Sequence, residues 1–341
     1  MKKTEQNTMK TILITGGAGF IGTNLVRHLA GQGFELIVID HVRETWNRKN
    51  FCDLTEQLHV RMLSFDLCDR IRLAAVFEKY SPCLVTHLAA ESHVDKSIAF
   101  PEAFVSSNIR GTMSLLETTT TYWKRNGESN DFRFHYCSTD EVYGSLGPVG
   151  AFHETLPLHP NNPYSATKAA GEHLVTAWAN TYGLPAIITR SSNNYGPCQG
   201  PDKFIPLTIG RCLKGEPVLI HGTGQNVRDW MHVHDHVRAI HAILEHGKIG
   251  EVYNIGGGAD SERTNQEIAE TICDLADEIL GREKHATRNQ ITFVADRPGN
   301  DFRYAMDTSK LYHQTGWKPN TVLENGLRGT VQWYLENYNN I

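Results

Sequence analysis

Short apolar runs alternate with amphipathic stretches along the first half of the chain. The apolar runs have strand length and fall at 11–15, 36–39, 60–65, 83–90 and 132–137. Stretches with helical periodicity follow or separate them at 20–32, 69–80, 101–125 and 163–182. Strands that alternate with helices predict an α/β fold with a doubly wound parallel sheet.

A glycine-rich turn follows the first apolar run. Gly16, Gly19 and Gly22 permit a tight turn, close approach of a pyrophosphate, and close packing of a helix on a strand. The second apolar run ends at Asp40. In dinucleotide-binding folds an acidic side chain at this position accepts hydrogen bonds from the ribose. An acid at this position repels a 2′-phosphate. The first half therefore predicts a Rossmann-type domain that binds NAD rather than NADP.

The alternation becomes less regular after residue 194. We expect residues 1–9 to be a flexible leader and residues 10–194 to form mainly the NAD-binding domain. Residues 195–341 should form mainly a smaller mixed α/β lobe that binds the substrate, with strand segments near 230–256 returning to the large sheet.

Tyr164 and Lys168 lie four residues apart in a stretch that begins with Asn161-Asn162-Pro163, a typical helix start. On a helix they share one face. A phenol titrates near pH ~10, and an ammonium group one turn away favours the phenolate and lowers its pKa. The pair predicts a tyrosine base that can start the oxidation of an alcohol.

Two acidic residues follow the run at 132–137. Asp140 and Glu141 come directly after Ser138 and Thr139, at the carboxyl end of a predicted buried strand. Ligands of such sheets bind at these strand ends, so the acids should lie near the tyrosine. Close carboxylates titrate as a coupled pair, one charged and one neutral. One acid and one base are what the loss of water from a sugar requires.

The composition argues against two classes of binding partner, nucleic acids and membranes. The formal charge is −5, from 33 basic and 38 acidic residues, and no dense basic run indicates a nucleic-acid surface. No apolar stretch approaches the roughly 20 residues of a membrane-spanning helix. Seven scattered cysteines without a Cys-x-x-Cys pair favour reduced thiols and a cytoplasmic location.

These motifs together resemble the extended short-chain dehydrogenase/reductase family, and most closely its dTDP-glucose 4,6-dehydratase group. The likeness extends over almost the whole chain from about residue 10, and its matching stretches are 16–22, 88–95, 138–144, 164–168, 190–197, 226–230, 253–256 and 296–299. Similar epimerases carry small or polar residues in place of Asp140 and Glu141. Similar decarboxylases keep the Glu but have Ser at the position of Asp140.

The resemblance implies a redox-neutral reaction in three steps. Tyr164, assisted by Lys168 and near Thr139, takes the proton of the sugar 4-hydroxyl while the C4 hydride passes to NAD⁺. Glu141 removes the C5 proton and Asp140 protonates the departing 6-hydroxyl. The hydride then returns to C6, which gives a 4-keto-6-deoxy sugar.

The resemblance also implies the binding residues. NAD is expected to contact Gly16, Gly19, Phe20, Ile21, Gly22, Asp40, Asp66, Leu67, Leu88, Ala89, Ala90, Ser92, Ser107, Tyr164, Lys168 and Asn193. The nucleotide sugar is expected to contact His93, Thr139, Asn194, Lys203, Phe204, His221, Arg228, Asn254, Arg297 and Asn300. Guanidinium groups such as those of Arg228 and Arg297 suit a diphosphate. A homodimer is expected, with the helices 101–125 and 163–182 pairing with their mates.

His232, His234 and His236 alternate along a possible strand, a spacing that can place them on one face. The implied reaction needs no metal, so we expect structural or exposed histidines and no metal site.

Three departures from the group leave the substrate open. His221 stands where a tyrosine commonly stacks on the base, Asn300 replaces a common histidine, and the run after Asp40 differs. The first two concern the nucleotide, so a UDP-sugar dehydratase is an alternative. A C4 epimerase or decarboxylase of the same fold, and a non-enzymatic NAD-binding relative, are further alternatives, which Asp140 and the intact Tyr164–Lys168 pair disfavour.

Overall fold

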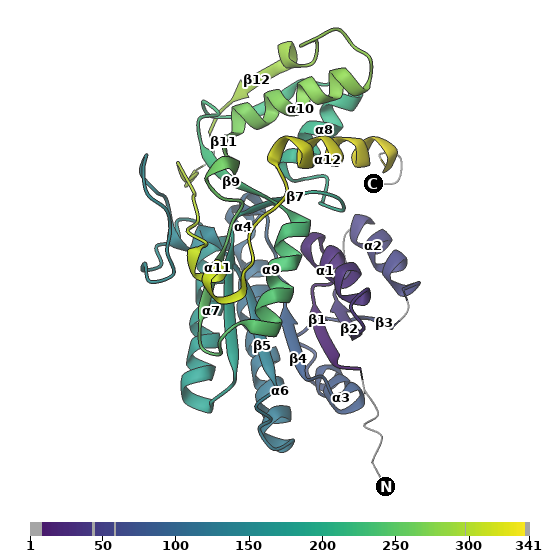
Figure 1. The fold of residues 1–341 in the computed structure, drawn as a ribbon, viewed down its shortest axis with the longest axis vertical. Helices are drawn as coiled ribbons and strands as arrows, with labels where there is room; N and C mark the ends of the chain where they lie inside the picture. The colour runs from purple at the N-terminus through teal and green to yellow at the C-terminus, as the bar shows by residue number, and fades with distance from the viewer. Residues whose placement is uncertain (1–8, 43–44, 58, 297, 338–341) are drawn as a thin grey trace.

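A seven-stranded parallel sheet forms the centre of the molecule (Figure 1). The structure is a computed structural model and describes residues 9–42, 45–57, 59–296 and 298–337. The strand order is β10-β6-β5-β4-β1-β2-β3. The strands are β1 (Thr11–Thr15), β2 (Glu35–Asp40), β3 (Val60–Ser64), β4 (Leu84–His87), β5 (Arg133–Thr139), β6 (Ala186–Ser191) and β10 (Val252–Ile255).

This sheet confirms the predicted doubly wound fold. The chain builds outward from β1 in one direction through β2 and β3, then continues on the other side of β1 from β4. The order therefore reverses between β1 and β4, and ligands of open α/β sheets bind at such a reversal. β4 is shorter than the predicted run 83–90. β5 is longer, so that Ser138 and Thr139 belong to the strand itself.

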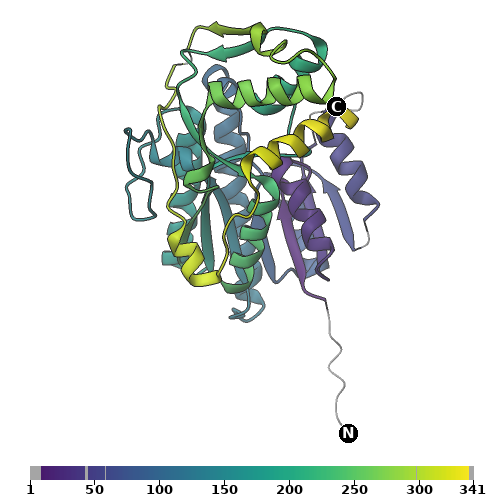
Figure 2. The ribbon, with the colours of Figure 1, turned by 45° about the horizontal axis from the view of Figure 1, so that its top comes forward.

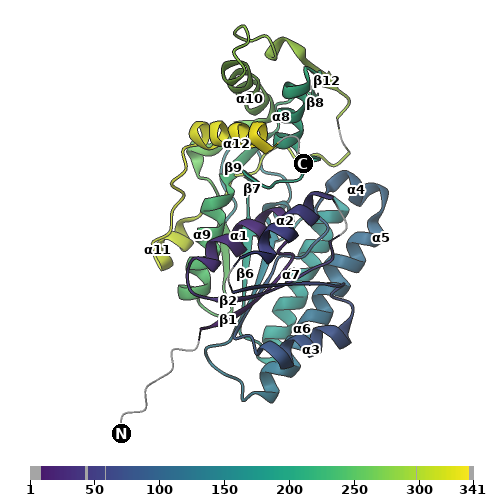
Figure 3. The ribbon, with the colours of Figure 1, turned by 90° about the vertical axis from the view of Figure 1, so that its right-hand side faces the viewer.

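Helices cover both faces of the sheet, as Figure 3 shows. On one face, Leu25 and Leu29 pack with Val237 and Ile240. The other face is covered by helices that include Phe77, Leu115 and Val175. The first set is α1 (Phe20–Ala30), α9 (Val233–His246) and α11 (Ser309–Thr315), with α2 (Thr45–Thr55) beside α1; the second is α3 (Arg70–Tyr80), α4 (Val94–Ala99), α6 (Thr112–Arg125) and α7 (Pro163–Tyr182).

The predicted helix 101–125 is helical throughout but changes its hydrogen bonding. It consists of α5 (Pro101–Phe104), the π-helical turn η1 (Val105–Gly111) and α6. Asn108 lies buried in η1, where its Oδ1 accepts from Glu91 N at 2.8 Å and its Nδ2 donates to Thr167 Oγ1 at 2.9 Å. These bonds tie the loop after β4 to α7. π-turns of this kind are frequent next to functional sites.

A smaller lobe stands beyond the carboxyl ends of the central strands (Figures 1 and 2). It contains a three-stranded sheet and a two-stranded sheet, with a core that includes Ile209, Ile272 and Val331. Its elements are β7 (Asn193–Tyr195), β8 (Val218–His221), β9 (Val227–His232), β11 (Glu262–Thr264), β12 (Ile291–Val294), α8 (Phe204–Lys214), α10 (Asn265–Ile279) and α12 (Leu323–Asn337).

Of the segments near 230–256, only β10 joins the large sheet. β9 pairs with β7 and β11 in the three-stranded sheet, and α9 occupies the interval between β9 and β10. A helix therefore separates the two strands, and of the two it is β10 that lies in the large sheet. The division of the chain at residue 194 stays a prediction.

Candidate active site

The glycine turn is packed too closely for side chains. Gly16 has φ 75°, and a Cβ there would lie 2.5 Å from Ala89 N. A Cβ on Gly22 would lie 2.1 Å from Gly16 O. Gly19 precedes α1 without a side-chain cap. The first N–H groups of a helix have no intrahelical partner, so this helix start suits a phosphate.

Asp40 closes the turn from the neighbouring strand. Its Oδ2 accepts from Ala18 N at 2.8 Å, and burial raises the pKa of the carboxyl. This contact places an acid beside the loop at the end of β2. The close-packed turn, the uncapped helix and the acid fit an adenine dinucleotide.

The other residues expected to bind the cofactor follow neighbouring strand ends. Leu88, Ala89 and Ala90 follow β4, while Asp66 and Leu67 follow β3. Asn193 begins β7, and its buried Oδ1 has no hydrogen-bond partner among the described residues. An unsatisfied buried acceptor is costly, so a ligand donor suits this position. Phe20 and Ile21 start α1, Ser92 follows β4 in the same loop, and Ser107 lies in η1.

Helix α7 carries the tyrosine and the lysine. It begins with a capping box in which Asn162 Oδ1 accepts from Ser165 N at 2.9 Å. Lys168 Nζ donates to Cys137 O at 2.7 Å and lies 4.3 Å from the ring centroid of Tyr136. Burial lowers the pKa of Lys168 to about 8. Tyr164 is also buried, so both side chains are fixed within the protein.

The expected lowering of the Tyr164 pKa is wrong for the protein alone. Burial raises the pKa of the phenol well above its usual value, and the Glu141 carboxylate adds to the rise. The side chain of Thr139 acts in the opposite direction. The ammonium of Lys168 donates to the backbone carbonyl of Cys137, and burial of the phenol determines the direction of the shift.

Strand β5 leads directly into the acids. Asp140 and Glu141 lie in the short 3₁₀-helix η2 (Asp140–Tyr143). The Thr139 hydroxyl donates to Asp140 Oδ1 at 3.2 Å, and Glu141 N donates to Thr139 Oγ1 at 3.3 Å. Asp140 Oδ2 is buried without a partner among the described residues. The acids are thus fixed beside Thr139, with one carboxyl oxygen left to meet a ligand.

The environments of the two carboxyls raise their pKa values to different extents. Burial, followed by the charges of Glu141 and Asp229, raises the pKa of Asp140 well above its usual value. Burial also raises the pKa of Glu141, but a hydrogen bond from Asn162 Nδ2 at 3.1 Å opposes this rise. Asp140 is therefore the acid and Glu141 the group that ionises more readily. This supports the division of roles expected from the sequence.

Two cations from the smaller lobe lie close to the acids. Arg228 and Lys203 both lower the pKa of Glu141 through their charges. Arg228 Nη2 donates to Asn300 Oδ1 at 3.0 Å, and its guanidinium lies 4.5 Å from the Tyr304 ring centroid. Lys203 Nζ donates to Ser92 O at 2.9 Å, next to the start of α8 at Phe204. The cations and Asn300 lie on the side of the acids that the smaller lobe covers.

Asn254 is a correction among the expected substrate contacts. It is fully buried in β10, its Oδ1 accepts from Tyr143 OH at 2.8 Å, and its Nδ2 donates to Phe152 O at 2.8 Å. Both the oxygen and the nitrogen of its amide are bonded within the protein, and none of its surface is exposed. Asn194 Oδ1 pairs with His236 Nδ1 at 3.0 Å, while Asn194 Nδ2 donates to Ser192 O at 2.9 Å.

Two further expected contacts, His93 and His221, have partners within the protein, and a third lies outside the described residues. His93 caps α4 and faces Asp202 at 3.6 Å. His221 is exposed at the end of β8, where its Nδ1 lies 3.1 Å from Ala295 O. Arg297 lies outside the described residues.

The histidines 232, 234 and 236 do not alternate along a strand. His232 ends β9 and caps α9, whereas His234 and His236 lie in that helix. A helix turns by 100° per residue, so the three side chains do not share a face. Among the described residues, no group of three potential ligands could hold a metal ion.

Two contacts of the site were not found from the sequence. Asn162 was recognised as a helix cap, but its second contact with Glu141 was missed. Arg190, buried in β6, forms an ion pair with Glu172 at 2.7 Å and donates to Tyr143 OH at 2.7 Å. A charged residue inside the apolar run Ala186–Ser191 was the available signal, since buried charges are paired.

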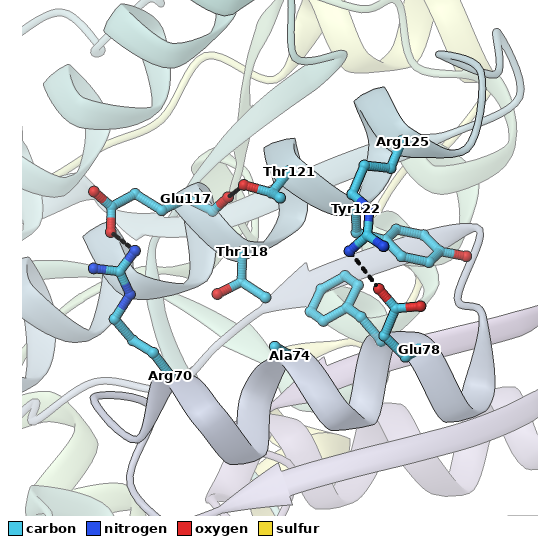
Figure 4. A pocket seen from close by; sticks show the side chains of 9 residues that line it. Arg70, Ala74, Glu78, Glu117, Thr118, Thr121, Tyr122 and Arg125 are labelled. Carbon is cyan, nitrogen blue, oxygen red and sulfur yellow. Dashed lines mark hydrogen bonds and ion pairs between the residues drawn. The ribbon is translucent and has the colours of Figure 1, made fainter.

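A separate hollow of about 200 Å³ lies between α3 and α6 (Figure 4). Arg70 pairs with Glu117 at 2.7 Å and Arg125 with Glu78 at 3.0 Å along its sides. Neither Asp140 nor Glu141 lines this hollow, and no residue of the glycine turn does. In the part of the chain that the structure describes, no helix is long and apolar enough to cross a membrane.

Comparison with known proteins identifies the family. The family model described as GDP-mannose 4,6 dehydratase matches residues 13–330. The chain belongs to this family. Solved structures similar to it are enzymes of the extended short-chain dehydrogenase/reductase fold, as the motifs indicated.

Individual relatives are similar over nearly their whole length. A dTDP-glucose 4,6-dehydratase of Salmonella typhimurium is 48% identical over 338 residues, which cover 96% of this chain and 93% of the relative. One from Neisseria meningitidis is 47% identical over 337 residues, with 96% and 94% covered. The crystal structure of a dTDP-glucose 4,6-dehydratase from Streptomyces venezuelae with NAD bound has a TM-score of 0.87 and 38% identity, covering 96% of this chain and 98% of that one.

The fold alone does not select the reaction. A UDP-glucose 4-epimerase from Thermotoga maritima has a TM-score of 0.83 and 31% identity, covering 96% of this chain and 99% of that one. Dehydratase and epimerase thus share the backbone. The reaction must be argued from the side chains of the site.

Proposed function

We propose that the protein is an NAD-dependent nucleotide-sugar 4,6-dehydratase that converts dTDP-glucose to its 4-keto-6-deoxy product. The observation that carries this proposal is the pair of acids, buried Asp140 and partly buried Glu141, at the end of β5 beside Tyr164. An epimerase needs the tyrosine but not the acids. The relatives of 47% and 48% identity support the choice of dTDP-glucose.

The glycine turn, Asp40 and the uncapped start of α1 would hold the cofactor. When bound, NAD⁺ supplies the acceptor for the C4 hydride and, once reduced, returns that hydride to C6. The free Oδ1 of Asn193 adds an acceptor at the same rim. NAD is also what the titles of similar solved dehydratases name as bound.

Tyr164 takes the proton of the sugar 4-hydroxyl. Its raised pKa keeps the phenol protonated at neutral pH, so the ammonium of Lys168 and the hydroxyl of Thr139 must stabilise the phenolate as it forms for Tyr164 to act as a base. The positive charge of the oxidised cofactor would act in the same direction. Oxidation at C4 produces a ketone, which acidifies the neighbouring C5 proton.

Glu141 then takes the C5 proton, and Asp140 gives its proton to the 6-hydroxyl, which leaves as water. The environment of each carboxyl suits its role. Asp140 is kept neutral by burial and by two nearby carboxylates, whereas Glu141 accepts a hydrogen bond from Asn162 Nδ2. Two acids whose environments separate their pKa values are the usual arrangement for paired acid and base catalysis.

Arg228 and Lys203 are proposed to hold the diphosphate. Both groups are near Glu141, and a guanidinium fork matches phosphate oxygens. Arg297, outside the described residues, remains part of this proposal. The nucleobase would be met by the region of His221 and Asn300, where the chain departs from the usual residues of its group.

Incubation with dTDP-glucose and UDP-glucose tests the proposal. We expect a 4-keto-6-deoxy sugar from dTDP-glucose, seen by nuclear magnetic resonance as a new methyl group at C6. A product that retains its 6-hydroxyl would contradict the proposal and favour an epimerase. Conversion of UDP-glucose in preference to dTDP-glucose would show that the proposed nucleotide is wrong, but it would still support the proposed dehydration.

A homodimer and a cytoplasmic location complete the proposal. Leu115 and Leu116, on the helix expected at a dimer interface, are internal core. Support comes instead from exposed apolar side chains on elements next to α7: Ile98, Phe100, Val105 and Met113, of which Phe100 is 70% exposed. Sedimentation should show a dimer that Phe100→Glu weakens. The seven cysteines are all free thiols, which supports a reducing compartment.

A further inference from the structure

A buried polar chain joins the helix that carries the base to the turn that carries the acids. Glu172 lies on α7, four residues after Lys168, and it binds the side chain of Arg190 with both oxygens. Arg190 Nε donates to Glu172 Oε1 at 3.1 Å and its Nη2 donates to Glu172 Oε2 at 2.7 Å. The exposed fractions of the two side chains are 7% and 3%.

The chain continues into the acid turn. Arg190 Nη1 donates to Tyr143 OH at 2.7 Å, and Tyr143 OH donates to Asn254 Oδ1 at 2.8 Å. The guanidinium carbon also lies 4.6 Å from the Tyr143 ring centroid. Tyr143 is the last residue of η2, which begins with Asp140 and Glu141. Its hydroxyl is thus a donor and an acceptor in the same chain.

The other side of the Tyr143 ring is covered as well. Phe152 stacks on it with ring centroids 4.6 Å apart and an angle of 14° between the planes. Asn254 Nδ2 donates to Phe152 O, which closes the arrangement onto β10. A turn of only four residues has little hydrogen bonding of its own, so these contacts fix where it lies.

We propose that Tyr143, Arg190 and Glu172 are positioning residues. They fix the place of η2, the turn that carries Asp140 and Glu141, relative to α7, and they serve the elimination step rather than the oxidation. The contacts of the three side chains are made with one another and with neighbouring residues of the protein. Tyr164 and Lys168 are positioned by the backbone of α7, and Lys168 also by its bond to Cys137 O, so neither side chain depends on this hydrogen-bond network. Besides this network, η2 is held by the bond from Asn162 Nδ2 to Glu141 and by the bond from His159 N to Val142 O. The network adds contacts from β6 and β10 at Tyr143, the last residue of η2, and Arg190 connects it to Glu172 on α7.

The consequence is a selective one. Loosening η2 moves Asp140 and Glu141 relative to C5 and C6 but leaves Tyr164 in place against C4. Misplacement of a catalytic group by about 1 Å can cost about 10²-fold in rate. We therefore expect the rate of dehydration to fall while the rate of C4 oxidation is kept. This inference rests on the proposed dehydratase function.

The test is Tyr143→Phe, which keeps the ring and its stacking on Phe152 but removes the hydroxyl that links Arg190 to Asn254. Two substrates separate the steps. dTDP-glucose reports the whole reaction, whereas dTDP-xylose has no C6 and can only be oxidised at C4. Oxidation is followed by the near-ultraviolet absorbance of the reduced nicotinamide, and dehydration by the 4-keto-6-deoxy product.

We expect Tyr143→Phe to lower dehydration by about 10- to 100-fold and to leave oxidation of dTDP-xylose within about twofold of the wild type. Reduced cofactor should accumulate during turnover of dTDP-glucose, because elimination becomes the slow step. Arg190→Lys should act in the same direction. A matched control is Arg328→Lys, since Arg328 makes the same two-bond pair with Glu278 on the surface, at 2.9 and 2.8 Å.

Equal losses in both rates, or no loss in either, would overturn the inference. A general loss of folding lowers both rates together and is measured separately as a lower melting temperature. If the wild type dehydrates dTDP-glucose and the ratio of the two rates is unchanged in Tyr143→Phe, only this inference fails. If the wild type does not dehydrate dTDP-glucose at all, the proposed function fails first.

Discussion

The base-bearing helix and the acid-bearing turn meet at the same site but are held in different ways. α7 is a helix of 20 residues with a capping box, and its backbone places Tyr164 and Lys168. η2 has 4 residues and depends on side-chain contacts from α7, β6 and β10. The first structure belongs to the fold that dehydratases and epimerases share. The second gives this chain its particular chemistry, so the two regions can be disabled separately.

The largest expected effect is on the helix. Tyr164→Phe removes the group that takes the 4-hydroxyl proton, so both oxidation and dehydration should fall by about 10²- to 10⁴-fold. The rates with dTDP-xylose and dTDP-glucose measure the two effects. Tyr182→Phe, at the exposed end of the same helix, is the control and should leave both rates unchanged. Retained oxidation in Tyr164→Phe would remove the tyrosine from its role.

A change in the turn should affect only one step. Asp140→Asn keeps the size of the side chain and the acceptor for Thr139, but it cannot donate a proton to the leaving hydroxyl. We expect dehydration to fall by about 10²- to 10⁴-fold while dTDP-xylose is still oxidised. A loss of oxidation as large as the loss of dehydration would show that the two regions do not act separately.

Asn162 links the two regions and offers a smaller, sharper test. Its Oδ1 caps α7, while its Nδ2 donates to Glu141. Asn162→Asp keeps the cap but places a carboxylate against Glu141, which raises the Glu141 pKa further. The acidic limb of the rate profile should move to higher pH, with a loss of about tenfold near its midpoint.

Asn162→Ser is the matched variant for this test. Serine also caps helices but is too short to reach Glu141, so the limb should move less than in Asn162→Asp. An unchanged profile in Asn162→Asp would mean that Glu141 is not the base whose ionisation limits the rate.

The pH dependence of the wild-type rate should depend on one group from each region, Glu141 on η2 and Lys168 on α7. Glu141 must be ionised, and because its pKa is raised from 4.5, the rate should fall as the pH drops through a value above 4.5. Lys168 must be charged, and its pKa of about 8 places the fall on the alkaline side near that value. Each limb changes the rate about tenfold per pH unit beyond its pKa. A rate that stays constant well above pH 8 would contradict the role of Lys168.

The helix could be predicted from the sequence and the support of the turn could not. The spacing of Tyr164 and Lys168 and the start at Asn162 are local signals, as are the glycines and the strand that ends at Thr139. The pairing of Arg190 with Glu172 and Tyr143 joins residues far apart in the chain, which periodicity does not reveal. The same limit explains why Asn254 was expected at the substrate.

The pKa of Tyr164 was missed for a related reason. Spacing along a helix shows that a lysine is near, but it does not show how deeply the phenol is buried or that a carboxylate lies beside it. Burial and the acid turn, both products of the tertiary structure, determine the direction of that shift.

The most direct test of the account follows one hydrogen atom. If the acids expel water from C6 while the oxidised sugar stays in the site, the hydride removed from C4 must return to C6. dTDP-glucose labelled with deuterium at C4 should therefore give a product with deuterium in the C6 methyl group, measured by nuclear magnetic resonance. Deuterium that returns to C4 in a sugar that keeps its 6-hydroxyl would contradict the account.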